Sequence, residues 1–153
     1  LEMPAGLVTA QTQCRAIFKN IHRIERESVM NALGRMNKPS LTKKVLHRTD
    51  IVKSHLGHQF PELALITKTA VQCRNHFVHG GSDNFNYAAV APFSVFLTDA
   101  LEFTFAASDL IEAGWNASSW SNKHYGGGHN FTRFRWEYDE SLAKLKAALD
   151  NNN

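Results

Sequence analysis

The chain has 153 residues, of which 43% are hydrophobic and ten are phenylalanine. This composition supplies a core for one compact domain and excludes a largely disordered chain. No unbroken apolar run reaches the ~20 residues that cross a bilayer, so we expect no membrane association. The net charge of +3 is unevenly distributed along the chain. Residues 1–60 carry ten Lys/Arg and four acidic residues, whereas residues 61–153 carry seven Lys/Arg and ten acidic residues. The basic half could attract a polyanion or could be a solvated helix face, and the sequence leaves both interpretations open.

The two ends of the chain are expected to lie outside the domain. Residues 1–6 read LEMPAG, with Met in third place, and resemble a cloning scar. Residues 7–149 are predicted to form the domain, and residues 150–153 a polar tail. The start has no signal-peptide pattern, and the two distant cysteines, Cys14 and Cys73, do not make a disulfide framework. We therefore expect a cytoplasmic location with reduced thiols.

Apolar residues recur at helical spacing through most of the chain. The spacing predicts helices over residues 9–33, 41–57, 61–78, 91–113 and 138–149. Residues 115–135 are rich in Gly, Ser, Asn and aromatic residues and are predicted to be irregular. Strand signals are scarce. The sequence therefore predicts an all-α bundle of four to five helices with an irregular aromatic-rich segment before the last helix.

The predicted helix over residues 91–113 has apolar residues around most of its circumference. Its charged residues are all acidic and fall mainly on one stripe: Asp99, Glu102, Asp109 and Glu112. Such a helix is buried on several sides. It is either the central core helix or a dimer contact.

Cationic, amide and imidazole side chains gather where the third predicted helix ends, before Gly80 and Gly81. Arg74 can bind a phosphate through two parallel hydrogen bonds. His79 can transfer protons at neutral pH. The two residues differ by about 140° around a helix, a gap that the long arginine side chain can span. The alternative is an arginine that solvates the helix end beside a histidine that caps carbonyl groups.

The run Arg74-Asn75-His76-Phe77-Val78-His79 resembles the signature of the HEPN superfamily, an Arg followed by a His after four to six residues. The motif lies at the end of a predicted helix, as in that superfamily. The chain looks most like the Apea-like branch, on the evidence of the run from Arg74 to Gly80, Gly114-Trp115 and the segment from His129 to Phe131. The resemblance covers roughly residues 7–149. It implies a domain from the C-terminal end of a larger bacterial defence protein.

The resemblance implies an endoribonuclease that needs neither a metal nor a cofactor. In such families two HEPN domains pair and their Arg/His motifs face each other. His79 would act as general acid or base, Arg74 would hold the scissile phosphate, and Asn75 would orient the motif. The product would carry a 2′,3′-cyclic phosphate, with transfer RNA as a plausible substrate and a sensor domain of the parent chain as the restraint. Some HEPN toxins have tyrosine two residues after the histidine, where this chain has Gly81.

Other residues carry weaker signals. His76 is expected to be a surface or interface residue, and the Cys73-x-x-His76-x-x-His79 spacing makes a metal site conceivable without a clear fourth ligand. Residues 126–129 read Gly-Gly-Gly-His, which we interpret as a flexible loop. The aromatic and basic residues of 115–136 either stack on bases or attach this segment to the bundle. The alternative function is a non-catalytic helical module that binds RNA, nucleotide or protein.

Overall fold

The computed structural model describes residues 5–36, 38–80, 85–123 and 128–150. The chain divides into two compact units, Leu1–Ser40 and Leu41–Asn153. Every regular element in the described ranges is a helix, which confirms the predicted all-α class. Most of the residues assigned to a cloning scar and to the polar tail fall outside these ranges.

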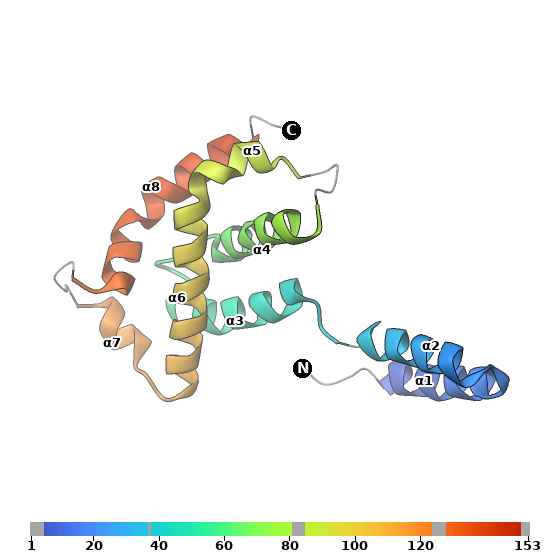
Figure 1. The fold of residues 1–153 in the computed structure, drawn as a ribbon. Coiled ribbons are helices and arrows are strands. Elements are labelled where there is room, and N and C mark those ends of the chain that lie inside the picture. The colour runs from blue at the N-terminus through green and yellow to red at the C-terminus, as the bar shows by residue number, and fades with distance from the viewer. Residues whose placement is uncertain (1–4, 37, 81–84, 124–127, 151–153) are drawn as a thin grey trace. The chain divides into compact units, whose positions relative to one another are not determined.

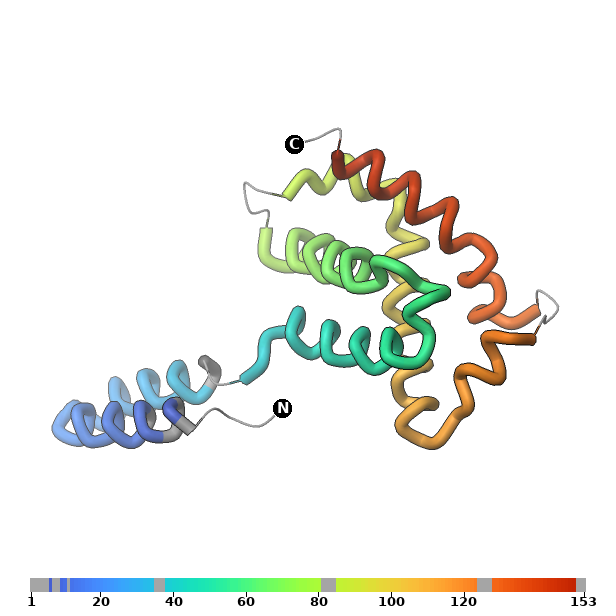
Figure 2. Tube along the Cα trace, turned by 180° about the vertical axis from the view of Figure 1, so that it is seen from behind, coloured from blue at the N-terminus to red at the C-terminus, as the bar shows by residue number. Residues whose placement is uncertain are grey.

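The first unit consists of two helices rather than the single helix predicted over residues 9–33. Helix α1 spans Ala5–Ile17, the short η1 spans Phe18–Asn20, and α2 spans Arg23–Met36. The chain turns at Ile21, whose extended backbone (φ −83°, ψ 148°) ends the first helical segment. The two helices then run side by side in opposite directions (Figures 1 and 2). Helical spacing alone did not reveal this turn, because both helices continue the same apolar periodicity.

The second unit is built around four long helices (Figure 1). They are α3 (Leu41–Leu56), α4 (Leu63–His79), α6 (Ser94–Glu112) and α8 (Asn130–Asp150). The short α5 (Tyr87–Val90) and η2 (Ala91–Phe93) lead into α6, and α7 (Ala117–Ser121) follows it. In both views α6 crosses α3 and α4, and α8 covers another side of it (Figures 1 and 2).

The segment predicted to be irregular, residues 115–135, contains helices. The side chain of Asn116 accepts a hydrogen bond from the backbone N–H of Ser119 at 2.8 Å and so caps α7. Helix α8 begins at Asn130, eight residues before the predicted start. Thr132 and Phe134 are buried and extend the inward stripe that continues at Tyr138. The prediction was wrong because the polar residues of this stretch hide that stripe.

Helix α6 is the central core helix, the first of the two alternatives for this segment. Seven of its side chains are buried: Phe96, Leu97, Ala100, Phe103, Thr104, Ala107 and Ser108. The ring of Phe103 lies 4.5 Å from that of Phe60 and 5.0 Å from that of Phe134, centroid to centroid. Phe134 and Trp120 are buried in this cluster. These rings therefore attach the aromatic-rich segment to the bundle, whereas Trp136 is exposed.

The stretch Tyr87–Glu112 is also long and apolar enough, by length and composition, to cross a membrane. The expectation of no membrane association rested on the lack of a long unbroken apolar run. Polar residues interrupt this stretch, but its mean hydropathy is still high enough to meet the criterion. The core helix of a protein outside the membrane passes the same test. Here the buried face of α6 packs against α3, α4 and α8.

The acidic stripe of α6 is partly neutralised by arginines from neighbouring helices. Arg48 of α3 pairs with Asp109 at 3.0 Å and also with Glu112. Arg133 of α8 lies 3.6 Å from Asp99. Exposed pairs of this kind contribute little to stability. They do show that Arg48 and Arg133 already have carboxylate partners within the domain.

Candidate active site at the end of helix α4

The first half of α4 is anchored in the core. Ile66 and Ala70 are buried in the core cluster, and the hydroxyl groups of Thr49 and Thr67 lie 3.1 Å apart between α3 and α4. Both threonine side chains are buried; one hydroxyl can donate to the other, and the accepting hydroxyl then donates to a carbonyl of its own helix, that of Val45 or Leu63. Buried polar groups that are fully hydrogen-bonded fix the position of a helix. Helix α4 is therefore a rigid support for whatever its far end carries.

The second half of α4 leaves the core and carries the motif. Arg74 and His79 are exposed, and Asn75 is half-buried. The helix ends at Gly80, whose φ of 79° and ψ of 157° are accessible at low cost only to glycine. The predicted glycine stop is confirmed. It places His79 in the last helical position, next to a sharp change in chain direction.

The structure brings Arg74, Asn75 and His79 together. The guanidinium Nη1 of Arg74 lies 3.5 Å from Nε2 of His79, and it donates to Oδ1 of Asn75 at 3.2 Å. The long arginine side chain therefore covers the angular gap between positions 74 and 79. Because Asn75 accepts from the arginine, it holds the guanidinium on the side where the imidazole lies.

The electrostatic surroundings of the motif favour an anion. Among the described residues, no carboxylate lies within 4.0 Å of Arg74, whereas Arg48 and Arg133 are engaged by acids of α6. The guanidinium is thus an exposed, permanently charged group. An exposed imidazole stands directly beside it. The pair can bind a phosphate and exchange a proton with it or with its substituents.

His76 has a different environment from the two exposed motif residues. Its ring stacks on that of Tyr87, with centroids 4.8 Å apart and an interplanar angle of 3°. Its Nδ1 is buried and has no hydrogen-bond partner in the described part of the chain. The expected surface or interface residue is half-buried, because α5 folds back over this face of α4. We assign His76 a packing role between α4 and α5.

Cys73 is half-buried beside the motif, and burial raises the pKa of its thiol. The thiol therefore stays protonated at neutral pH, a form that is a poor nucleophile and a poor metal ligand. Within the described ranges, no group of three or more His, Cys, Asp or Glu side chains is placed to hold a metal ion. The Cys-x-x-His-x-x-His spacing does not bring these side chains together as ligands.

An apolar pocket of about 370 Å³ lies next to Arg74, between α4, α5 and α6. Among the described residues that line it, Arg74 alone is charged, and Phe77 and Tyr87 form part of its wall with their rings 5.7 Å apart. The side chains of Phe77 and Val78 are 77% and 55% exposed. Large apolar side chains that stay exposed around a polar motif are typical of an interaction surface.

Neither the pocket nor the role of Tyr87 in its wall is predicted from the sequence. Phe77 lies one helical turn from Arg74, and this spacing could have suggested that both share a face. Tyr87 lies between the predicted helices over residues 61–78 and 91–113, and no local signal places its ring on α4. Gly81, where some relatives have tyrosine, lies outside the described residues.

The site and the bundle define the class of protein: an all-helical domain with an exposed Arg-Asn-x-x-x-His motif at the end of a core helix. Comparison with protein families then gives a match to the Apea-like HEPN family over residues 6–119. The chain belongs to the Apea-like HEPN family. The matched range includes the whole motif and ends before α8. Comparison with curated proteins and with solved structures gives no significant match. HEPN domains are commonly ribonucleases.

Proposed function

We propose that this chain is a metal-independent endoribonuclease. One observation carries the proposal: an exposed guanidinium and an exposed imidazole lie 3.5 Å apart at the end of a rigid helix. Membership of the Apea-like HEPN family supports it. The arrangement supplies an anion-binding group and a proton-transfer group, and cleavage of RNA through its own 2′-hydroxyl requires no other nucleophile.

In this mechanism His79 accepts the proton of the ribose 2′-hydroxyl. The 2′-oxygen attacks the adjacent phosphorus, the bond from phosphorus to the 5′-oxygen breaks, and the departing 5′-oxygen takes a proton from a second acid. The products are a 2′,3′-cyclic phosphate and a 5′-hydroxyl. Arg74 binds the phosphate and stabilises the charge that develops on its oxygens, while Asn75 positions Arg74.

The second acid would come from His79 of another copy in a homodimer. The exposed side chains of Phe77 and Val78 beside the motif support such pairing, because burying them would remove apolar surface from water. Replacing both with Ser should weaken self-association and cleavage together, as measured by sedimentation and by RNA cleavage at matched protein concentration. Full activity in a strictly monomeric double variant would contradict the composite site.

The biological setting is also part of the proposal. Apea-like membership supports a role in bacterial anti-phage defence, with transfer RNA as a candidate substrate and the cytoplasm as the location. A ribonuclease of this kind is toxic unless restrained. We therefore expect a sensor domain in the parent chain to control it.

The test is incubation of the purified protein with total cellular RNA in the presence of EDTA. We expect cleavage products with cyclic phosphate ends from the wild type and none from His79→Ala. His47→Ala is the matched control, because His47 is an exposed histidine on α3 and is not part of the motif, and it should cleave normally. Full activity of His79→Ala would overturn the assignment. RNA binding by a dimer without cleavage would favour the alternative, a non-catalytic helical module.

A further inference from the structure

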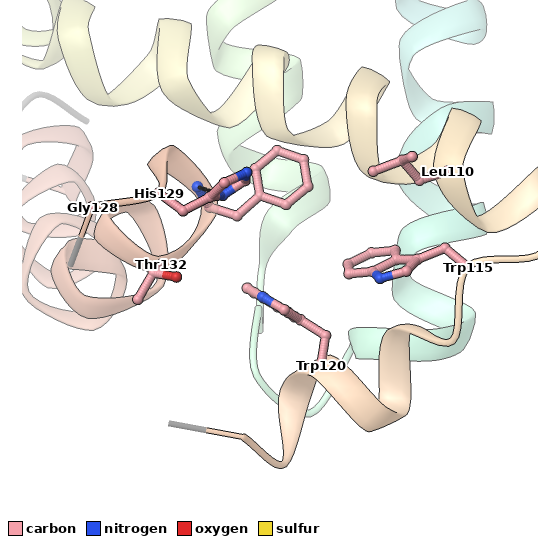
Figure 3. A pocket seen from close by; sticks show the side chains of 7 residues that line it. Leu110, Trp115, Trp120, Gly128, His129 and Thr132 are labelled. Atoms are coloured by element: carbon pink, nitrogen blue, oxygen red, sulfur yellow. Dashed lines mark hydrogen bonds between the residues drawn. The ribbon is translucent and has the colours of Figure 1, made fainter. Parts of the chain in front are cut away.

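A second pocket, of about 510 Å³, lies at the other end of α6 (Figure 3). It is formed where the end of α6, helix α7 and the beginning of α8 meet. Its lining residues are Leu110, Trp115, Trp120, Gly128, His129, Phe131 and Thr132. The volume falls within the range of ~300–1,000 Å³ that is usual for small-molecule sites.

Aromatic rings form most of the wall. Trp115 and Trp120 have centroids 5.6 Å apart, and Phe131 lies 6.2 Å from Trp115 and 6.3 Å from Trp120. The His129 ring meets Phe131 edge to face at 5.1 Å. Figure 3 shows the rings arranged around one space, with the two tryptophans on one side and His129 on the other. Such a wall favours a flat ring that can lie against aromatic faces.

A polar group in this wall has no partner. Thr132 is 2% exposed, and its Oγ1 makes no hydrogen bond with any described residue. Its side chain lines the pocket, and Figure 3 shows the hydroxyl oxygen on the side that faces Trp120. A buried hydroxyl without a partner costs free energy, which a hydrogen bond from an occupant would recover. The pocket thus offers one donor or acceptor at its inner wall.

The charges of the wall limit the occupant further. None of the seven lining residues is Lys, Arg, Asp or Glu. The nearby cation of Arg135 lies over the Trp120 ring at 5.3 Å and donates to the carbonyl oxygens of Ser121 and Lys123. The Arg135 side chain is therefore held in place by its contacts with Trp120, Ser121 and Lys123. The part of a ligand that enters the pocket should be uncharged.

We propose that this pocket binds a nucleobase: a flat, uncharged heteroaromatic ring with a polar edge. The base lies against the rings of Trp115, Trp120 and Phe131, and its edge hydrogen-bonds to the Thr132 hydroxyl. The base can belong to a free nucleoside or to a nucleotide of RNA. The site is separate from the motif, because the pocket at Arg74 contacts α6 between Ser94 and Leu101.

Indole fluorescence tests the proposal directly. Of the three tryptophans, Trp115 and Trp120 line the pocket, and Trp136 is 60% exposed elsewhere on α8. In a Trp136→Phe background, adenosine and uridine are titrated separately. We expect saturable quenching by at least one nucleoside, with a dissociation constant on the order of 0.1 mM. Absence of saturable quenching with both nucleosides and with the oligonucleotide below would overturn the proposal.

Two variants identify the contacts. Trp115→Leu should weaken binding about tenfold, because it removes a stacking surface. Thr132→Val keeps the shape of the side chain and should weaken binding about fivefold through loss of one hydrogen bond. Phe105→Leu is the matched control, since Phe105 is an exposed aromatic residue on α6, the helix that contributes Leu110 to the wall, and does not line the pocket. Unchanged affinity in both pocket variants, with their folds intact, would contradict the site.

A single-stranded oligonucleotide distinguishes the sources of the base. A hexanucleotide of adenosine is added in a His79→Ala background, so that the motif cannot cleave it. Competition with adenosine that is lost in Trp115→Leu assigns the site to RNA. Quenching by adenosine without competition by the hexanucleotide assigns it to a free nucleoside. Both results support a nucleobase pocket, and neither depends on cleavage at His79.

Discussion

The two halves of α4 belong to one helix and have opposite surroundings. From Leu63 to Val71 most side chains are buried, and the threonine pair joins the helix to α3. From Arg74 to His79 every side chain is at least partly exposed, including the apolar side chains of Phe77 and Val78. The first half resembles the interior of any helical bundle, whereas the second keeps both cationic and apolar groups in solvent.

This difference separates stability from the proposed activity along a single helix. Substitutions in the buried half remove packing that the exposed half does not share. Substitutions in the exposed half should change chemistry and association with little effect on unfolding, because exposed side chains contribute little to the folded state. Variants of α4 and of its neighbours can therefore test whether the two properties are separable.

The largest expected effect is on stability, from Ile66→Ala. The Ile66 side chain is fully buried in the core cluster, and its truncation should lower the free energy of unfolding by about 2–5 kcal/mol. Urea denaturation followed by circular dichroism measures this. Val78→Ala in the exposed half is the control and should change stability by less than about 0.5 kcal/mol. Equal losses in the two variants would remove the distinction between the halves.

Arg74→Lys tests the chemistry of the exposed half. Lysine keeps the positive charge and loses the planar fork that grips a phosphate with two hydrogen bonds. We expect RNA cleavage to fall about 10- to 100-fold with an unchanged thermal midpoint. The measurement is the initial cleavage rate of a labelled RNA beside a melting curve. Wild-type rates in the lysine variant would mean that charge alone suffices.

Gly80→Ala tests how the boundary of the helix positions His79. An alanine in the backbone conformation of Gly80 costs on the order of 1.5 kcal/mol. We expect a similar loss of stability and a lower cleavage rate, because the strain displaces the last helical turn. Gly114→Ala is the matched control, since Gly114 also has a positive φ but ends α6. It should lose stability and keep its cleavage rate, and a rate that falls equally in both would point to unfolding instead.

The smallest effect concerns the attachment of the buried half. The Tyr138 hydroxyl donates to the Pro61 carbonyl at 2.5 Å, just before α4 begins. Tyr138→Phe should lower stability by about 1 kcal/mol at neutral pH.

This difference should depend on pH. Burial raises the pKa of Tyr138, and the nearby charges of Asp139 and Glu62 add to the effect. The unfolded chain releases the phenolic proton near pH 10, before the folded chain does, so wild-type stability falls as the pH rises above about 10. The phenylalanine variant lacks this loss, and the gap between the two proteins should narrow. A constant gap from pH 8 to 11 would contradict the role of the hydroxyl proton.

The sequence predicted the features that depend on local chemistry. Helical spacing gave the all-α class, and the glycine after His79 gave the end of α4. The meeting of Arg74 and His79 followed from the length of the arginine side chain, while the roles of these residues in catalysis stay predictions.

The rest depends on contacts between distant segments, which local patterns do not contain. Ile17 and Ile24 have core-like spacing but are 71% and 72% exposed, because spacing gives a face and does not supply a partner for it. Tyr87 stacks on His76 only because α5 returns to α4. The aromatic pocket likewise requires residues from α6, α7 and α8 to meet, and no motif along the chain predicts that meeting.

The contribution of α8 to the core has a consequence during protein synthesis. Phe134, Tyr138, Leu142 and Leu145 belong to the same buried cluster as the first half of α4. When the motif residues of α4 have been synthesised, α8, which completes the core around α4, has not yet been made. Domains fold as units once their segments are available. The motif residues are therefore synthesised before the helix that completes the core around α4, and we expect this order to delay the formation of the proposed site.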